Sequence, residues 1–166
     1  MSHTCLFIGR FQPFHKGHLM VLKGMVKVCG RVVIGIENPN APFSFENPFS
    51  FEERKEMIQR SLQDEDLIPK FNIDLIAIPD HALDKTWADQ CLQTVQDVDT
   101  IWTGNEDVKK CFEDKNVKIQ MIKEVPGISS TIIREAIKNS EDWKKKVPDA
   151  VVQVIVEVGG VQRMRD

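Results

Sequence analysis

The sequence predicts an α/β fold in which a mostly parallel, five-stranded sheet is flanked by helices. Five short apolar runs alternate with amphipathic stretches along the 166 residues, and this alternation is typical of parallel strands joined by helices. The length suits one domain with a single core. No linker, internal repeat or low-complexity tract interrupts the chain. We therefore expect residues 1–166 to form one domain.

Residues 4–36 predict the first strand-helix-strand unit. Residues 4–8 (TCLFI) form an apolar run that favours a buried strand, and RVVIGI (31–36) is rich in β-branched residues and predicts a second. The stretch 17–29 between them predicts a helix that Gly30 ends. The apolar residues on one face of this helix are Leu19, Leu22, Met25 and Val26. The crossover should be right-handed.

A loop rich in proline and phenylalanine follows at 37–50, and the next helix should begin at its end. Ser50 lies three residues before Glu53, ahead of an apolar helical face. This spacing predicts a capping box, in which the two side chains satisfy backbone N–H groups at the start of the helix.

The rest of the chain continues the alternation. Strands are predicted at 73–78, 100–103 and 117–122, and helices at 87–95, 106–113, 130–138 and 148–158. Pro148 suits a first helical turn, and Gly159–Gly160 should end the last helix. In such folds ligands bind beyond the carboxyl ends of the strands, where the strand order reverses.

Composition narrows the function classes. The net charge of −3 argues against a nucleic-acid binder, because such proteins are normally basic. No apolar run is long enough to span a membrane, and the N-terminus lacks a signal-peptide pattern, so we expect a cytoplasmic protein. The cysteines form no CxxC pair and are expected to be buried and reduced. They are Cys5, Cys29, Cys91 and Cys111.

The segment GRFQPFHKGH (9–18) falls on the first strand-to-helix turn. Helix starts attract anions because their N–H groups are unpaired and the helix dipole is positive there. Arg10 and the imidazoles of His15 and His18 add hydrogen-bond donors and charge, and Gly17 lets the backbone approach a phosphate closely. The segment matches neither a P-loop nor a dinucleotide fingerprint. It predicts a polyanion site of another kind.

A second candidate phosphate segment is ISSTIIR (128–134), near the C-terminus. Hydroxyls and free N–H groups at the start of a helix bind phosphate oxygens, and Arg134, one turn in, could reach the same anion with its planar fork. Taken alone, the segment favours simple helix capping. Together with the first segment, it favours phosphate binding.

The two segments are similar to the signatures of the HxGH nucleotidyltransferases, the superfamily of adenylyltransferases and cytidylyltransferases. The whole chain resembles the archaeal-type nicotinamide mononucleotide adenylyltransferases. Further matching segments are NPFSFEER (47–54), IPD (78–80), Trp87, TGN (103–105) and VVQVIVEVGGVQRMR (151–165). The resemblance implies a Rossmann-like domain that transfers AMP from ATP to nicotinamide mononucleotide (NMN), giving NAD and pyrophosphate. It also implies Mg²⁺ bound with ATP, a homo-oligomer, and C-terminal helices from about residue 130 that complete the ATP site.

The resemblance assigns the site residues to three groups. The catalytic group is His15, His18, Arg10 and Arg134. The ATP-binding group is Gly9, Phe11, Gly17, Gly104, Asn105, Ser129, Ser130 and Thr131. The substrate-binding group is Asp80, Trp87, Arg54 and Asn47, with the Trp87 ring stacking on the nicotinamide. No metal ligand from the protein is expected, because ATP and water would bind the magnesium.

From the residues alone, other interpretations stay open. Trp87 is equally suited to packing, and Arg54 to pairing with glutamates at the surface. Residues 37–45 (ENPNAPFSF) depart from the family pattern, which reads like GSAQxSHT there. The acceptor could therefore be pantetheine phosphate, flavin mononucleotide or glycerol phosphate instead, and the amide or acid form of the mononucleotide stays open. A regulatory module without turnover is a further alternative, whereas the missing GxGxxG argues against a dehydrogenase.

Overall fold

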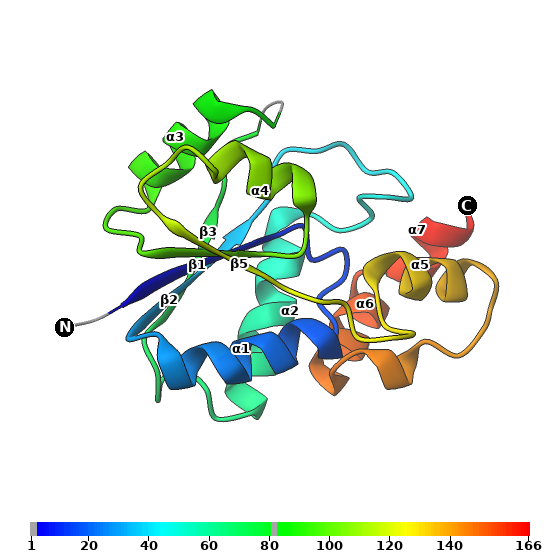
Figure 1. Cartoon of the computed structure of the whole chain (residues 1–166). Coiled ribbons are helices and arrows are strands. Elements are labelled where there is room, and N and C mark those ends of the chain that lie inside the picture. Colours follow the sequence, from blue (N-terminus) through cyan, green and yellow to red (C-terminus); the bar gives the residue numbers. More distant parts are fainter. Residues whose placement is uncertain (1–2, 81–82) are drawn as a thin grey trace.

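A five-stranded sheet lies at the centre of the computed structural model, which describes residues 3–80 and 83–166 (Figure 1). Its strands are β1 (Thr4–Gly9), β2 (Arg31–Ile36), β3 (Ile73–Ala77), β4 (Thr100–Thr103) and β5 (Lys118–Met121). Their order is β3-β2-β1-β4-β5, and every neighbouring pair is parallel. The chain moves outward from β1 to β3 and then crosses back to β4, so the strand order reverses between β1 and β4. The predicted sheet is confirmed.

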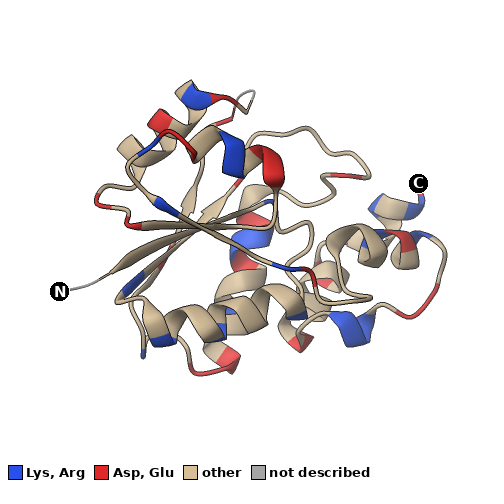
Figure 2. Cartoon of the chain, viewed as in Figure 1, with Lys and Arg blue, Asp and Glu red and all other residues tan. Residues whose placement is uncertain are grey.

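Helices cover both faces of the sheet (Figure 1). α1 (Lys16–Val28) and α2 (Phe51–Asp64) lie on one face, and α3 (Lys85–Thr94) and α4 (Glu106–Phe112) lie on the other. Successive side chains of β1 point to opposite faces of the sheet, as strand geometry requires, and so pack in two different hydrophobic cores. Phe7 packs in the core under α1 and α2, whereas Leu6 packs with Trp87 under α3 and α4. Acidic and basic residues are interspersed over the helices (Figure 2).

The C-terminal part forms a helical layer beyond the carboxyl end of the sheet, close to the start of α1 (Figure 1). It contains α5 (Ser130–Lys138), a 3₁₀ turn (Lys144–Lys146), α6 (Asp149–Glu157) and α7 (Gly160–Arg165). The prediction that Gly159–Gly160 ends the last helix was wrong. Gly159, at φ 70°, ends α6 but also turns the chain into α7. Gly160 is buried there, and a Cβ on it would lie 2.7 Å from Cε1 of Phe49.

The prediction that all four cysteines are reduced was also wrong. Cys5 on β1 and Cys29 at the end of α1 form a disulfide, with Cα atoms 6.0 Å apart. The α1 crossover packs its last turn against β1, which brings together two residues that sequence spacing does not connect. Cys91 and Cys111 are free thiols and are buried, as predicted. Among the residues described, no helix is long and apolar enough to cross a lipid bilayer.

Candidate active site

A pocket of about 530 Å³ opens at the carboxyl ends of β1 and β4, where the strand order reverses. Its walls come from the first strand-to-helix turn, the start of α1, Glu37, the β4–α4 turn, residues 122–128 and the start of α5. Parallel α/β sheets bind ligands at this position. The chain therefore gathers both predicted phosphate segments around one cavity.

The two histidines cap the start of α1 reciprocally. Nδ1 of His15 accepts hydrogen bonds from the backbone N–H groups of Gly17 and His18, at 3.1 and 3.3 Å. Nδ1 of His18 accepts one from the N–H of His15 at 3.1 Å. Because both Nδ1 atoms are acceptors, each neutral ring carries its proton on Nε2. The rings stack with centroids 3.6 Å apart, inclined by 18°.

Both histidines are neutral in the free protein. Burial lowers the pKa of His15 to about 4. Burial also lowers the pKa of His18, and the neighbouring His15 lowers it further. The predicted contribution of a charged imidazole is therefore replaced by two neutral Nε2–H donors at neutral pH. Donors held in fixed positions can stabilise negative charge that develops on phosphate oxygens.

Two glycines let this turn close tightly. A Cβ on Gly17 would lie 2.9 Å from Cε1 of His15, so only glycine leaves room for the ring to cap the helix. A Cβ on Gly9 would lie 2.9 Å from the Phe11 ring. The buried Phe11 ring in turn packs edge-on against His18, with centroids 4.8 Å apart. Phe11 and Gly9, which were predicted to contact ATP, thus help to position His18 in this structure.

Side chains of α5 tie the second segment to the first. Ser129 caps α5 through the N–H of Ile132, and Oγ of Ser130 donates to the carbonyl of Pro13 at 2.9 Å. Nη1 of Arg134 donates to the carbonyl of Gln12 at 2.8 Å. The structure thus brings together segments that the sequence separates by more than a hundred residues.

Arg134 places a guanidinium group at the wall of the pocket. Its side chain is buried and lines the pocket, yet its Nε has no hydrogen-bond partner within the described chain. Burial lowers the pKa of Arg134, and the positive charge of Arg10 lowers it further. Two neighbouring guanidinium groups that repel one another favour binding of a polyanion.

Arg10 is exposed at the rim and contacts the 37–50 loop. Its Nη2 donates to the carbonyl of Glu46 at 2.9 Å and to Oδ1 of Asn47 at 2.8 Å. Asn47, predicted to bind substrate, here holds Arg10. Asp80, also predicted to bind substrate, accepts a hydrogen bond from Nδ2 of Asn40 at 2.8 Å and so holds the same loop.

Arg54 is a buried residue that orders the site's backbone. It is 1% exposed, so the interpretation as a surface arginine is wrong. Its guanidinium donates to four backbone carbonyls, those of Ser50, Arg10, Glu37 and Asn38, at 2.6 to 3.1 Å. Arg54 therefore joins the turn after β1 to the turn after β2, instead of pointing into the pocket.

Trp87 does not line the pocket in this structure. Its indole is 1% exposed in the core between α3 and α4, where Nε1 donates to the carbonyl of Pro79 and the ring packs edge-on against Phe112. The helical spacing of α3 turns Trp87 inward beside Cys91. The predicted stacking face on nicotinamide is not presented, and Trp87 acts here as a packing residue.

The turn between β4 and α4 forms another wall of the pocket. Gly104 and Asn105, which were predicted to bind ATP, both border the pocket. Oδ1 of Asn105 caps α4 by accepting from the N–H groups of Asp107 and Val108. Thr131, on the first turn of α5, is exposed and also borders the pocket.

Sequence reasoning missed two residues of this site. The Gln12 side chain exchanges two hydrogen bonds with the backbone of Phe49, at 2.9 and 3.0 Å, and so fixes the first turn to the start of α2. Glu37 lines the pocket directly after β2. The sequence could have indicated both residues by their position, because each follows a strand at the edge of the sheet where ligands bind.

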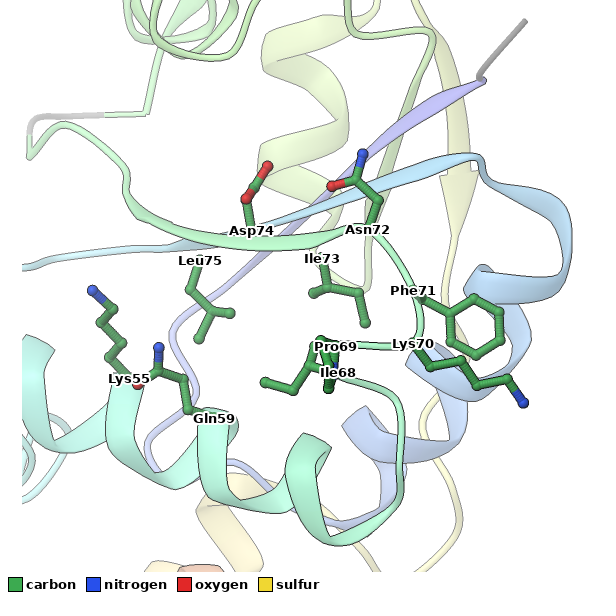
Figure 3. Close-up of a pocket in the computed structure, with 10 residues that line it drawn as sticks. All are labelled: Lys55, Gln59, Ile68, Pro69, Lys70, Phe71, Asn72, Ile73, Asp74 and Leu75. Carbon is green, nitrogen blue, oxygen red and sulfur yellow. The ribbon is translucent and has the colours of Figure 1, made fainter.

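A larger pocket of about 700 Å³ lies elsewhere, between α2 and the outer strand β3 (Figure 3). Ile73 and Leu75 point toward α2, whereas Asp74 points away (Figure 3). This pocket is shallow, and among the residues that the structure describes no histidine or arginine lines it. It lies at the edge of the sheet, away from the reversal of strand order, and gathers none of the predicted site residues. Over residues 3–80 and 83–166, no three His, Cys, Asp or Glu side chains are placed to hold a metal ion.

Comparison with known proteins gives a consistent set of relatives. A family model described as cytidylyltransferase-like matches residues 6–136. The nicotinamide-nucleotide adenylyltransferase of Thermococcus sibiricus is 36% identical over 162 residues, covering 96% of this chain and 87% of the relative. The nicotinamide-nucleotide adenylyltransferase of Thermoplasma volcanium is 33% identical over 166 residues, covering 99% and 92%.

Solved structures share the fold at lower identity. A bifunctional NMN adenylyltransferase/ADP ribose pyrophosphatase from Francisella tularensis, complexed with AMP and a Mn ion, superposes with a TM-score of 0.78 at 22% identity. The match covers 99% of this chain and 52% of that one, so this chain spans about half of the bifunctional protein. A nicotinic acid mononucleotide adenylyltransferase from Plasmodium falciparum, complexed with NaAD, gives 0.68 at 13% identity, with 98% of each chain covered.

Proposed function

The chain belongs to the cytidylyltransferase-like family, and from this premise we infer that it is an NMN adenylyltransferase, which joins ATP and NMN to give NAD and pyrophosphate. Its curated relatives carry the name nicotinamide-nucleotide adenylyltransferase over nearly their full length. The observation that carries the inference is the single pocket in which the stacked histidines meet Arg134.

The reaction needs positioning more than it needs a protein nucleophile. A 5′-phosphate oxygen of NMN attacks the α-phosphorus of ATP in line, a P–O bond forms, and the bond to pyrophosphate breaks. Negative charge builds up on the phosphate oxygens during transfer. Preorganised donors that face this charge lower the barrier.

The site residues supply such donors from two helix starts. We assign Nε2–H of His18 to the α-phosphate and Nε2–H of His15 to the phosphate beside it. Arg134, Arg10 and the start of α5 would hold the β- and γ-phosphates, so the C-terminal helices would complete the ATP site. The β4–α4 turn would receive the adenosine.

Magnesium fits this site as a companion of ATP. The pocket offers imidazole and guanidinium donors that suit anions, and hard cations such as Mg²⁺ prefer oxygen ligands. The triphosphate and water would therefore bind the ion, which would neutralise charge on the leaving pyrophosphate. The proposal also includes a cytoplasmic location and a homo-oligomer, as the family resemblance implies. Light scattering of the purified protein would measure the oligomeric state.

Replacing Arg134 by alanine is expected to raise the KM for ATP roughly 10- to 100-fold, the value of one charge-assisted hydrogen bond. The change in kcat should be smaller. Arg134→Lys keeps the charge but not the planar fork and should recover the KM only in part. Initial rates at varied ATP measure the effect, with Glu135→Ala, an exposed neighbour on α5, as the matched control. An unchanged KM in Arg134→Ala would remove this residue from the triphosphate site.

The activity itself is tested by mixing the protein with Mg²⁺, ATP and NMN and measuring NAD and pyrophosphate. Equimolar formation of both is the expected result. Pyrophosphate released only with pantetheine phosphate, flavin mononucleotide or glycerol phosphate would keep the transferase and change the acceptor. Binding of ATP without release of pyrophosphate would instead identify a regulatory module.

A further inference from the structure

Glu37 is an acidic residue that lines the pocket directly after β2. Its N–H donates to the carbonyl of Gly9 at 2.9 Å and so extends the β1–β2 ladder by one residue. Side chains two apart on a strand point to the same face. A Cβ on Gly35 would meet Ile78 and Leu6, in the core under α3 and α4. Glu37 therefore faces the α3–α4 side of the sheet.

Three of the groups that suit phosphate are gathered on one side of the pocket. The groups that suit phosphate, His15, His18 and Arg134, lie at the starts of α1 and α5. The β4–α4 turn and residues 122–128 form the wall beyond β4. Among the described lining residues, Glu37 alone comes from the β2–β3 half of the sheet. In-line transfer requires the acceptor to approach opposite the leaving pyrophosphate, so this half of the sheet is left for the acceptor.

The two forms of the acceptor differ in charge at the base. The nicotinamide ring of NMN is a pyridinium cation with a neutral carboxamide, whereas nicotinic acid mononucleotide carries a carboxylate on the same ring. A carboxylate beside the ring attracts the pyridinium of both acceptors, but it repels the carboxylate that only the acid form carries. We propose that Glu37 is a specificity-determining residue, whose carboxylate faces the pyridinium ring and makes the enzyme prefer the amide over the acid. This inference rests on the proposed function.

The protonation of Glu37 makes the preference depend on pH. Burial raises the pKa of Glu37 to about 7, although Arg10 and Arg54 each act to lower it. Below that pH the carboxyl is neutral and does not repel the acid acceptor, whereas above it the carboxylate does. The 5′-phosphate is the same in both acceptors, so its own titration cancels in their ratio.

Other charged or titratable groups lie around Glu37. They are Arg10 after β1, Arg54 on α2, Asp80 after β3, Cys91 on α3, Cys111 on α4 and His18 on α1. The pKa of His18 is lowered by burial, so the ring stays neutral. Burial raises the pKa of Cys91 to about 12 and also raises that of Cys111. Glu37 is thus the group expected to change charge near neutral pH.

The test measures kcat/KM for NMN and for nicotinic acid mononucleotide at saturating ATP, at pH 6, 7 and 8. In the wild-type protein the ratio of the two, amide to acid, should rise about 10-fold over this range, as expected for repulsion between carboxylates in a partly solvated pocket. In Glu37→Gln and Glu37→Ala the ratio should be low and independent of pH. The KM for ATP should move less than the ratio in both variants.

Glu124→Gln is the matched control, because it removes an exposed carboxylate from the opposite wall of the same pocket. Its amide-to-acid ratio should follow the wild type. Equal ratios in wild type and both Glu37 variants would overturn the inference while leaving the proposed function intact, and so would an equal fall in Glu124→Gln. A wild-type protein that makes no dinucleotide from either acceptor would instead reject the proposed function, and the inference with it.

Discussion

Replacing His18 by alanine is expected to lower kcat about 10²- to 10³-fold, the effect of removing one transition-state hydrogen-bond donor. The neutral ring presents its Nε2–H from a fixed position, since Nδ1 is held by the N–H of His15 and the ring is packed against Phe11 and His15. The KM for ATP should change much less, because the donor acts where charge develops. Steady-state kinetics at saturating NMN measure the loss.

A second variant separates chemistry from helix capping. Asparagine at this position keeps an oxygen where Nδ1 caps α1, but it has no donor at the place of Nε2. His18→Asn should therefore retain the thermal stability that His18→Ala loses, yet show the same fall in kcat. Met20→Ala, an exposed position on the same helix, is the control. Near wild-type turnover in His18→Asn would refute the assignment of His18 to the α-phosphate.

Replacing Trp87 by alanine is expected to lower the free energy of unfolding by about 3–5 kcal/mol, the usual cost of deleting a buried aromatic side chain. The indole fills the core beside Phe112, with ring centroids 5.8 Å apart, and its N–H satisfies the carbonyl of Pro79. Urea unfolding measures the loss. In the folded variant, the ratio of the KM for NMN to the KM for ATP should stay close to the wild-type ratio.

Trp87→Phe is the informative companion. It keeps most of the ring volume but removes the N–H group, so its stability should lie between those of wild type and Trp87→Ala. If Trp87 instead stacks on the substrate, Trp87→Ala would raise the KM for NMN selectively and leave stability nearly unchanged. That outcome would restore the role predicted from the family resemblance.

The sequence predicted the fold well because period and capping are local properties. The apolar run of β1, the β-branched run of β2 and the Ser50–Glu53 capping box all appear as expected. The helix α7, which follows Gly159, was missed because a Gly–Gly pair is typical of a helix end. Only the burial of Gly160 against Phe49 shows that the chain continues into another packed helix. The disulfide was missed because pairing depends on how α1 lies against β1.

The candidate site was predictable in residue type but not in orientation. His15, His18 and Arg134 line one pocket, in agreement with the two sequence segments. Arg54 and Trp87 were placed with the substrate, whereas their side chains are 1% exposed within the protein. The position of a residue on a helix does not show which way its long side chain points. At the ligand-binding edge of the sheet, such a side chain can point either to packing neighbours or to the ligand. Glu37 went unnoticed because a single acidic residue after a strand has no local signature.

The contacts of Ser130 with Pro13 and of Arg134 with Gln12 span 117 and 122 residues, and this has a consequence for folding. The phosphate site exists only when the two distant segments are packed together, so it belongs to the native state and is absent from the unfolded chain. Ligand and fold are then thermodynamically linked. ATP at a hundred times its dissociation constant would add about 2.7 kcal/mol to the stability of the entire chain, far beyond the residues that ATP touches.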